Sequence, residues 1–221
     1  MSRLIGALNS GTALVADVTG RGAELMRGVV SGGATALVCC VGPGEDWERM
    51  LTQVILGCES APWGVALDAH APASESVLLS VIDRGADFVI LPADVFPAWG
   101  LDVLESFPKV GRVISVPHNV TGDQAQVMET LGPQAIVVRL EDSALTIEAL
   151  AGARVIFESV ALRSLAWMAG LTSRESRLLR QVGAAGFIVG VGQDEPDWVM
   201  SRVHGLSQAI SEPVPLRGPL A

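Results

Sequence analysis

The sequence predicts an α/β protein, a single (β/α)8 TIM barrel over residues 1–221 with a short N-terminal helix at residues 1–11. Three observations lead to this fold. Short apolar runs recur at intervals of about 20 to 30 residues, the length of a strand–helix unit. The runs are continuously apolar rather than alternating, as in strands covered on both faces. The intervals show helical periodicity, and no linker or change of composition divides the chain.

The strands can be assigned in chain order. Glycine precedes several of them, as in Gly85-Ala86-Asp87, and its left-handed backbone would end the preceding helix. Helical periodicity covers residues 47–56, and Thr172 with Glu175 forms a capping box for a helix at 176–182. A doubly wound open sheet is the alternative, but the turn at 17–22 has no GxGxxG motif. The expected strands are 13–17, 35–40, 63–68, 87–92, 111–117, 135–140, 154–158 and 186–191.

The composition excludes several classes of protein. Apolar residues make up 49% of the chain, which is enough for a large core, and the net charge of −9 argues against a nucleic-acid partner. No apolar run approaches the roughly 18 residues of a membrane span, and the N-terminus lacks the apolar region of a secretory signal. Cys39, Cys40 and Cys58 are odd in number and form no CxxC motif. We therefore expect reduced thiols in a cytoplasmic protein that does not associate with membranes.

Chemistry in this fold takes place at the C-terminal ends of the strands, which we call the mouth of the barrel. Polar residues at a strand end that share a face with its small interior residues point into the mouth. Asp94 also follows a strand, where capping the next helix or pairing with an arginine at the rim is the simpler role. Other residues have alternative roles as well. Asp17 could cap the next helix, and His118 could belong to a turn. Arg139 and Glu141 could form an ion pair at the rim. The catalytic candidates are Asp17, Asp68, His70, His118, Arg139, Glu141 and Glu158.

Four of these side chains are suitable ligands for a divalent metal ion: Asp68, His70, Glu141 and Glu158. Together with His118, they could equally form a general acid–base set tuned by mutual repulsion. Many barrels bind phosphate with the loops after the seventh and eighth strands. Glycine there would let the phosphate of FMN approach closely. The acidic residues Asp194, Glu195 and Asp197 would repel a phosphate, so FMN is the weaker cofactor prediction. The predicted ligand-binding residues of these loops are Ser159, Gly190, Gly192 and Gln193.

The chain contains one lysine, Lys109, which precedes the fifth expected strand. This position is at the end of the barrel opposite the mouth. A Schiff-base mechanism needs an amine in the site. We therefore predict a chemistry that does not depend on a Schiff base.

Three segments, 85–92, 135–140 and 185–192, resemble strands of the 2-keto-3-deoxy-6-phosphogluconate aldolase type of barrel. Leu67-Asp68-Ala69-His70 is similar to the metal-binding strand of ribulose-phosphate epimerases. The resemblance implies the (β/α)8 fold. Arg139 occupies the position of the aldolases' Schiff-base lysine, and Cys39 with Cys40 that of the epimerases' histidine and aspartate. The catalytic motifs of both families are therefore missing.

The main functional hypothesis is an enzyme of the lyase or isomerase range that acts on a small polar metabolite by carboxylate and histidine acid–base chemistry. Two alternatives stay open at this point. One is a catalytically degenerate barrel that binds a metabolite or a protein partner, and the other is an FMN-dependent barrel. The tryptophans either pack between helices and barrel or contribute in part to a homodimer interface. They are Trp47, Trp63, Trp99, Trp167 and Trp198.

Overall fold

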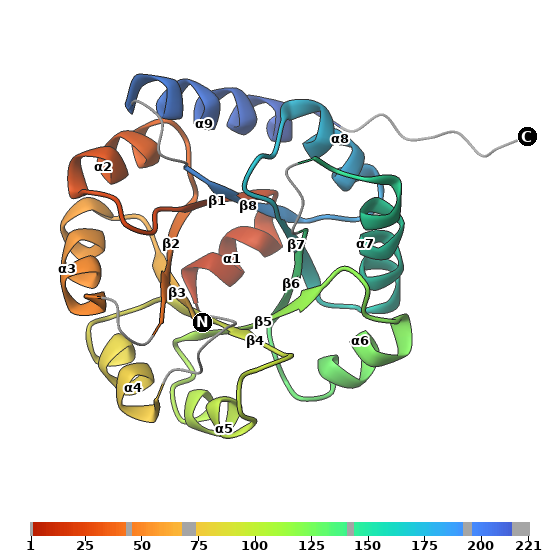
Figure 1. Ribbon diagram of the computed structural model, residues 1–221, viewed down its shortest axis with the longest axis horizontal. Coiled ribbons are helices and arrows are strands. Elements are labelled where there is room, and N and C mark those ends of the chain that lie inside the picture. The colour runs from red at the N-terminus through yellow and green to blue at the C-terminus, as the bar shows by residue number, and fades with distance from the viewer. Residues whose placement is uncertain (1, 43–45, 68–73, 141–143, 192–195, 214–221) are drawn as a thin grey trace, which may run out of the picture.

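A computed structural model describes residues 2–42, 46–67, 74–140, 144–191 and 196–213, which form a closed barrel of eight parallel strands surrounded by helices (Figure 1). The strands pair in chain order, and β8 pairs with β1. They are β1 Ala13–Asp17, β2 Ala36–Val41, β3 Trp63–Leu67, β4 Phe88–Pro92, β5 Gly111–Pro117, β6 Ala135–Arg139, β7 Arg163–Trp167 and β8 Gly186–Gly190. The helices are α1 Arg3–Ser10, α2 Ala23–Ser31, α3 Trp47–Gly57, α4 Glu75–Asp83, α5 Trp99–Glu105, α6 Gly122–Glu129, α7 Ile147–Ser159, α8 Ser173–Gln181 and α9 Pro196–Ser211. The predicted fold class is confirmed, including the N-terminal helix.

Seven of the predicted strands are confirmed to within one residue, apart from residue 68, which lies outside the described residues. The capping box of Thr172 and Glu175 is also present, at the start of α8. Lys109 precedes β5, at the N-terminal end of the barrel, as predicted. None of the described helices has the length and apolar character needed to cross a membrane.

The seventh predicted strand is wrong. Residues 154–158 form the last turns of α7, and the strand lies farther along the chain, at Arg163–Trp167. The buried side chains of α7 are Ala149, Ala153, Ile156 and Phe157, a spacing of four and then three residues that fits one face of a helix. Val155, Ile156 and Phe157 favour a strand locally, but packing of this face against the barrel decides in favour of a helix.

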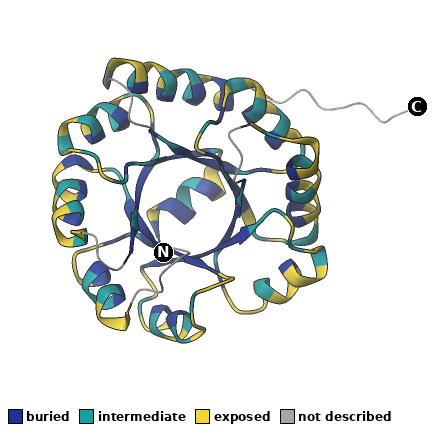
Figure 2. Cartoon of the chain, viewed as in Figure 1, coloured by how far each residue is buried: buried dark blue, intermediate teal, exposed yellow. Residues whose placement is uncertain are grey.

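Two layers of apolar side chains build the core. An inner cluster fills the barrel with alternate strand residues such as Val15, Ile90 and Val137. An outer cluster lies between the strands and the helices and takes the other strand residues, such as Leu14 and Val138. Figure 2 shows the result as a ring of buried strands inside helices whose outer faces are exposed. Coverage of both strand faces is the physical reason for the continuously apolar runs.

Helix α1 closes the N-terminal end of the barrel. It crosses the barrel centre in Figure 1, and its Leu4, Ile5 and Leu8 are buried in the inner cluster with the strand residues. Ser2 caps the helix, because its Oγ accepts a hydrogen bond from the backbone N–H of Ile5. The apolar face of this short helix therefore covers one end of the barrel interior.

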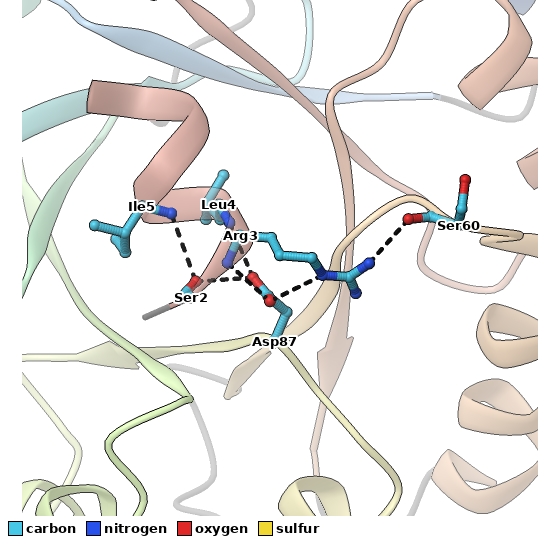
Figure 3. Close-up of polar contacts among 6 residues, drawn as sticks. All are labelled: Ser2, Arg3, Leu4, Ile5, Ser60 and Asp87. Carbon is cyan, nitrogen blue, oxygen red and sulfur yellow. Dashed lines mark hydrogen bonds and ion pairs between the residues drawn. The ribbon is translucent and has the colours of Figure 1, made fainter. Parts of the chain in front are cut away.

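The carboxylate of Asp87, directly before β4, holds the start of α1 (Figure 3). Its Oδ1 accepts hydrogen bonds from the backbone N and the Nε of Arg3, at 2.9 and 3.3 Å. Its Oδ2 accepts from the Oγ of Ser2 at 2.8 Å and from the backbone N of Leu4 at 2.9 Å. The Asp87 side chain is 8% exposed, and both of its oxygens are occupied by protein donors.

Candidate active site

The candidate site lies at the mouth, where the rows of interior side chains end. Asp17 continues the row of Ala13 and Val15, and Arg139 continues that of Ala135 and Val137, which all belong to the inner cluster. Both side chains therefore face the interior, as predicted. The predicted site residues Asp68, His70, Glu141, Gly192 and Gln193 lie outside the described residues.

Asp17 ends β1 with one carboxylate oxygen bound and the other open. Its Oδ1 accepts hydrogen bonds from the backbone N of Thr19 at 3.1 Å and from the Thr19 Oγ1 at 2.6 Å. The Thr19 Oγ1 in turn accepts from the backbone N of Cys40 at 2.8 Å, which ties the carboxylate to β2. Within the described parts of the chain, no group donates to Oδ2. The turn thus fixes the orientation of Asp17 and leaves one oxygen for another partner.

The environment of Asp17 changes its acidity. Burial raises the pKa of its carboxyl above the usual 3.8, although the two Thr19 hydrogen bonds and the nearby charge of Arg21 act in the opposite direction. A carboxyl with a raised pKa that still has an open oxygen can give up and take up a proton closer to neutral pH than an ordinary aspartate. Asp17 therefore has the properties of a general acid or base.

Arg139 ends β6, which β7 and β8 separate from β1 around the barrel. Its Nη2 donates to Oδ2 of Asp94 at 2.7 Å, so the guanidinium reaches past the end of β5 to the loop after β4. The Arg139 side chain is 16% exposed and that of Asp94 43%. The Arg139 Nε is buried, and no described residue accepts a hydrogen bond from it. The pairing of Asp94 with a rim arginine is confirmed.

Trp167 is an interior residue of the mouth that the sequence argument missed. It ends β7 and packs against the inner cluster, and it pairs in register with Arg139 on the adjacent strand. A seventh strand at 154–158 leaves Trp167 outside the strands, so the sequence predicts for it only packing between helices and barrel or a role at an interface. Its spacing from Leu165, two residues earlier in a strand, is the signal that would have placed it in the interior.

His118 lies on the outer side of the barrel wall. It follows β5 directly, one residue beyond the interior-facing position of Pro117, and its backbone carbonyl and ring lie against Gly152 of α7. A side chain at position 152 would collide with that carbonyl oxygen. The His118 Nδ1 is buried, and no partner for it occurs in the described residues. His118 therefore does not face Asp17 across the mouth, contrary to the prediction.

The prediction of Glu158 and Ser159 at the mouth is also wrong. Both residues end α7 and precede β7, so they do not follow a strand. Glu158 pairs with Arg154 one helical turn earlier at 2.8 Å, with both side chains more than half exposed. The Ser159 Oγ donates to the carbonyl of Val155 at 2.6 Å. Their contacts are those of an exposed helix end, and the cause of the error is the misplaced seventh strand.

The loops after β7 and β8 are held together by an arginine from α9. Arg202 donates to the carbonyl oxygens of Gly190, Ala169 and Leu171 at 3.2, 2.7 and 3.3 Å. At the start of α8, the Glu175 carboxylate accepts from the backbone N and Oγ1 of Thr172 and from the backbone N of Leu145. Burial raises the pKa of Glu175, but these hydrogen bonds outweigh it and lower the pKa below the usual 4.5. An anionic side chain therefore occupies the start of the helix that follows β7.

The described residues include no group of three or more His, Cys, Asp or Glu side chains placed to bind a metal ion. Three of the four predicted ligands lie outside the described residues, and the fourth, Glu158, is on α7. None of the three cysteines forms a disulfide. Cys39 belongs to the outer cluster and Cys40 packs against the inner one, which confirms that they face opposite sides of the strand.

The sequence matches no protein-family model, and no curated protein matches it either. Solved structures do resemble the fold. Tryptophan synthase from M. tuberculosis superposes with a TM-score of 0.74 at 13% identity, over 95% of this chain and 100% of that chain. Thiamine phosphate pyrophosphorylase from Pyrococcus furiosus gives 0.67 at 22% identity, over 94% and 97%. A native KDPGal structure gives 0.69 at 13% identity, over 89% and 93%.

These identities establish the fold alone. The likeness to KDPGal confirms, at that level, the resemblance to the 2-keto-3-deoxy-6-phosphogluconate aldolase type of barrel. Because a TIM barrel hosts many unrelated reactions, the function has to be argued from the residues of the mouth.

Proposed function

We propose that the protein is an enzyme that acts on a small polar metabolite at the mouth of the barrel, with Asp17 as the acid–base group of a lyase or isomerase reaction. One observation carries the proposal: the Asp17 carboxylate faces the interior with Oδ1 bound to Thr19 and Oδ2 open. Many reactions of both classes move a proton to or from carbon, and a positioned carboxylate can supply that step.

The surroundings of Asp17 support this role. The two bonds from Thr19 and the link from Thr19 to Cys40 hold the carboxylate in one orientation. Burial raises its pKa, which makes it a stronger base than a solvated aspartate once ionised. A carboxyl that only capped the next helix would place its oxygens at the helix start, but α2 has Gly22 as its N-cap without a side-chain cap. The alternative role of Asp17 as a helix cap is therefore not supported.

The FMN alternative has weaker support. FMN requires a phosphate site, and at the start of α8, after β7, the Glu175 carboxylate already accepts a hydrogen bond from the Thr172 backbone N–H. Arg202 is engaged with the carbonyl oxygens of the same loops. A degenerate barrel that only binds a metabolite differs from an enzyme in its expected behaviour, and the experiment below separates the two.

The test is proton exchange at carbon. The purified protein is incubated in D2O with a panel of small keto acids, hydroxy acids and ketoses, and loss of C–H signals is followed by proton NMR. We expect exchange with at least one member of the panel, and loss of that exchange in Asp17→Asn. Asp83→Asn is the matched control, because Asp83 is exposed in the last turn of α4 at the other end of the barrel. Binding without exchange in the wild type would support the degenerate barrel instead.

A further inference from the structure

Few charged side chains lie at the mouth among the strand-end residues that face the barrel interior. Among the described strand ends on the interior face, Arg139 is the only cation. Its guanidinium carries five N–H donors and stays protonated at any physiological pH. One donor group, Nη2, is used by Asp94, and Nε is buried with no described acceptor. A buried donor on a cation is costly to leave without a partner, so a missing acceptor is expected here.

The geometry of a guanidinium defines the acceptor. Its Nε–H and one Nη2–H point in parallel along the same edge and match the two oxygens of a carboxylate. Asp94 accepts one hydrogen bond from the guanidinium, from Nη2 to Oδ2, and its side chain is 43% exposed. Nη2 carries a second N–H. Asp94 therefore orients the guanidinium but does not satisfy the edge.

We propose that Arg139 binds the carboxylate group of the substrate through its Nε–Nη2 edge. This inference rests on the proposed function, and it narrows the substrate to a small carboxylic acid. Trp167 is the neighbour of Arg139 on β7 and faces the same interior, so it supplies an apolar surface for the carbon atoms next to the carboxylate.

The charges of the mouth favour a carboxylate over a phosphate. Asp17 and Asp94 are both at this end of the barrel; the charge of Arg21 already acts on Asp17, and Arg139 already pairs with Asp94. A monoanionic carboxylate needs only one cation. The start of α8, which could add backbone donors for a phosphate, already holds the Glu175 carboxylate. The described residues thus match one negative charge.

Binding of L-lactate, measured by isothermal titration calorimetry, tests the inference directly. Lactate has no carbonyl group, so the amine introduced by Arg139→Lys cannot form a Schiff base with it. We expect wild-type protein to bind lactate with about millimolar affinity, as two charge-assisted hydrogen bonds to a small ligand allow. Lactamide, which has the same shape without the charge, should bind at least about tenfold more weakly.

Two variants and one control complete the experiment. Arg139→Met should weaken lactate binding by at least about tenfold, and Arg139→Lys should fall between, because it keeps the charge but not the fork. Arg154→Met removes a positive charge from the exposed face of α7 and should leave the affinity unchanged. The inference is overturned if Arg139→Met binds lactate as wild type does, if wild type binds none at about 50 mM, or if inorganic phosphate binds more tightly than lactate.

The outcome is separable from that of the proposed function. Asp17→Asn should keep lactate binding and lose proton exchange. If lactate binding depends on Arg139 while Asp17→Asn keeps its exchange activity, the carboxylate site stands and the role of Asp17 falls. If binding is indifferent to Arg139 while exchange is lost in Asp17→Asn, the reverse holds.

Discussion

Each end of this barrel contains a carboxylate that is at least half buried, but the two carboxylates differ in how many hydrogen bonds they accept. At the closed end, Asp87 accepts four hydrogen bonds from the start of α1, with two at each oxygen. At the mouth, Asp17 accepts two hydrogen bonds from Thr19, both at Oδ1. Both oxygens of the Asp87 carboxylate accept hydrogen bonds from the protein, whereas only one oxygen of Asp17 does, so the other can accept from a ligand.

The same contrast holds for the two arginine–carboxylate pairs. Arg3 pairs with Asp87 at 3.3 Å, and its Nη1 also donates to the carbonyl of Ser60 at 2.9 Å (Figure 3). Arg139 pairs with Asp94 at 2.7 Å and leaves its Nε without a described acceptor. Buried polar groups are normally satisfied, so an incomplete set at one end of a barrel indicates a site rather than a support. The closed end stabilises the fold, and the mouth is available for chemistry.

The largest effect should come from Asp17→Asn on turnover. Loss of a general acid or base typically costs about 10²- to 10⁴-fold in rate. Proton exchange should therefore fall by at least the lower figure, whereas Asp83→Asn should be unchanged. An exchange rate within about threefold of wild type, too small a loss for a general base, would remove Asp17 from the chemistry.

Next in size is the loss of stability in Asp87→Ala. The change deprives Ser2, Arg3 and Leu4 of their acceptor at the start of α1. Four hydrogen bonds of about 1 kcal/mol each, two of them from backbone N–H groups of the first helical turn, predict a loss of about 2–4 kcal/mol in the free energy of unfolding. Urea unfolding measures it, with Asp83→Ala as the exposed control. A loss no greater than that of the control would mean that α1 is held by its apolar face alone.

A smaller effect of opposite sign is expected for Asp17→Asn on stability. Burial raises the pKa of Asp17, so the folded state binds its proton more tightly than the unfolded state does. The contribution of this carboxyl to stability is therefore greatest below pH 3.8, and it decreases as the pH rises through the higher folded-state pKa. At pH 7 the neutral asparagine should raise the free energy of unfolding by about 0.5–2 kcal/mol, the usual size of a single stabilising substitution.

This gain should shrink as the pH is lowered toward 3.8, because the wild-type carboxyl becomes neutral as well. Urea unfolding of both proteins across that range tests the sign. A gain that is constant with pH would show that the charge of Asp17 is not the cause.

The smallest effect should follow Asp94→Asn. The Asp94 side chain is 43% exposed, and exposed ion pairs contribute about 0–1 kcal/mol to stability. The melting temperature should therefore change little, in contrast to the Asp87 variant. A loss as large as that of Asp87→Ala would mean that Asp94 is a structural residue and that the two ends of the barrel are alike.

Much of the fold could be predicted because it depends on local patterns. Continuously apolar runs indicated strands that are covered on both faces, and glycines indicated where the helices end. Gly33, Gly85, Gly132 and Gly183, before β2, β4, β6 and β8, do have left-handed backbone, with φ between 81° and 117°. The prediction of the seventh strand was wrong because residues 154–158 carry both a strand-forming and a helix-forming pattern. The prediction follows the local β propensity, whereas the structure follows the longer helical spacing of buried residues that ends at Ile156 and Phe157.

The site was less predictable, because it depends on which strand end each residue occupies. The alternation along β1 and β6 was enough to direct Asp17 and Arg139 inward. The single error in the seventh strand had two consequences for the predicted site. It left Trp167 out of the mouth, and it wrongly placed Glu158 and Ser159 there. The contact of Asp87 with α1 joins residues more than 80 positions apart in the chain, and no local pattern reports such a pairing.

The most direct test is urea unfolding of Asp17→Asn and Asp87→Asn side by side at pH 7. The two substitutions are chemically identical and affect carboxylates at opposite ends of one barrel. We predict opposite signs: Asp17→Asn is at least as stable as wild type, and Asp87→Asn is less stable by at least about 1 kcal/mol, since an amide cannot accept at both positions. If both variants lose stability to the same extent, Asp17 is a structural residue, and the proposed distinction between a closed end that supports the fold and a mouth that performs chemistry is contradicted.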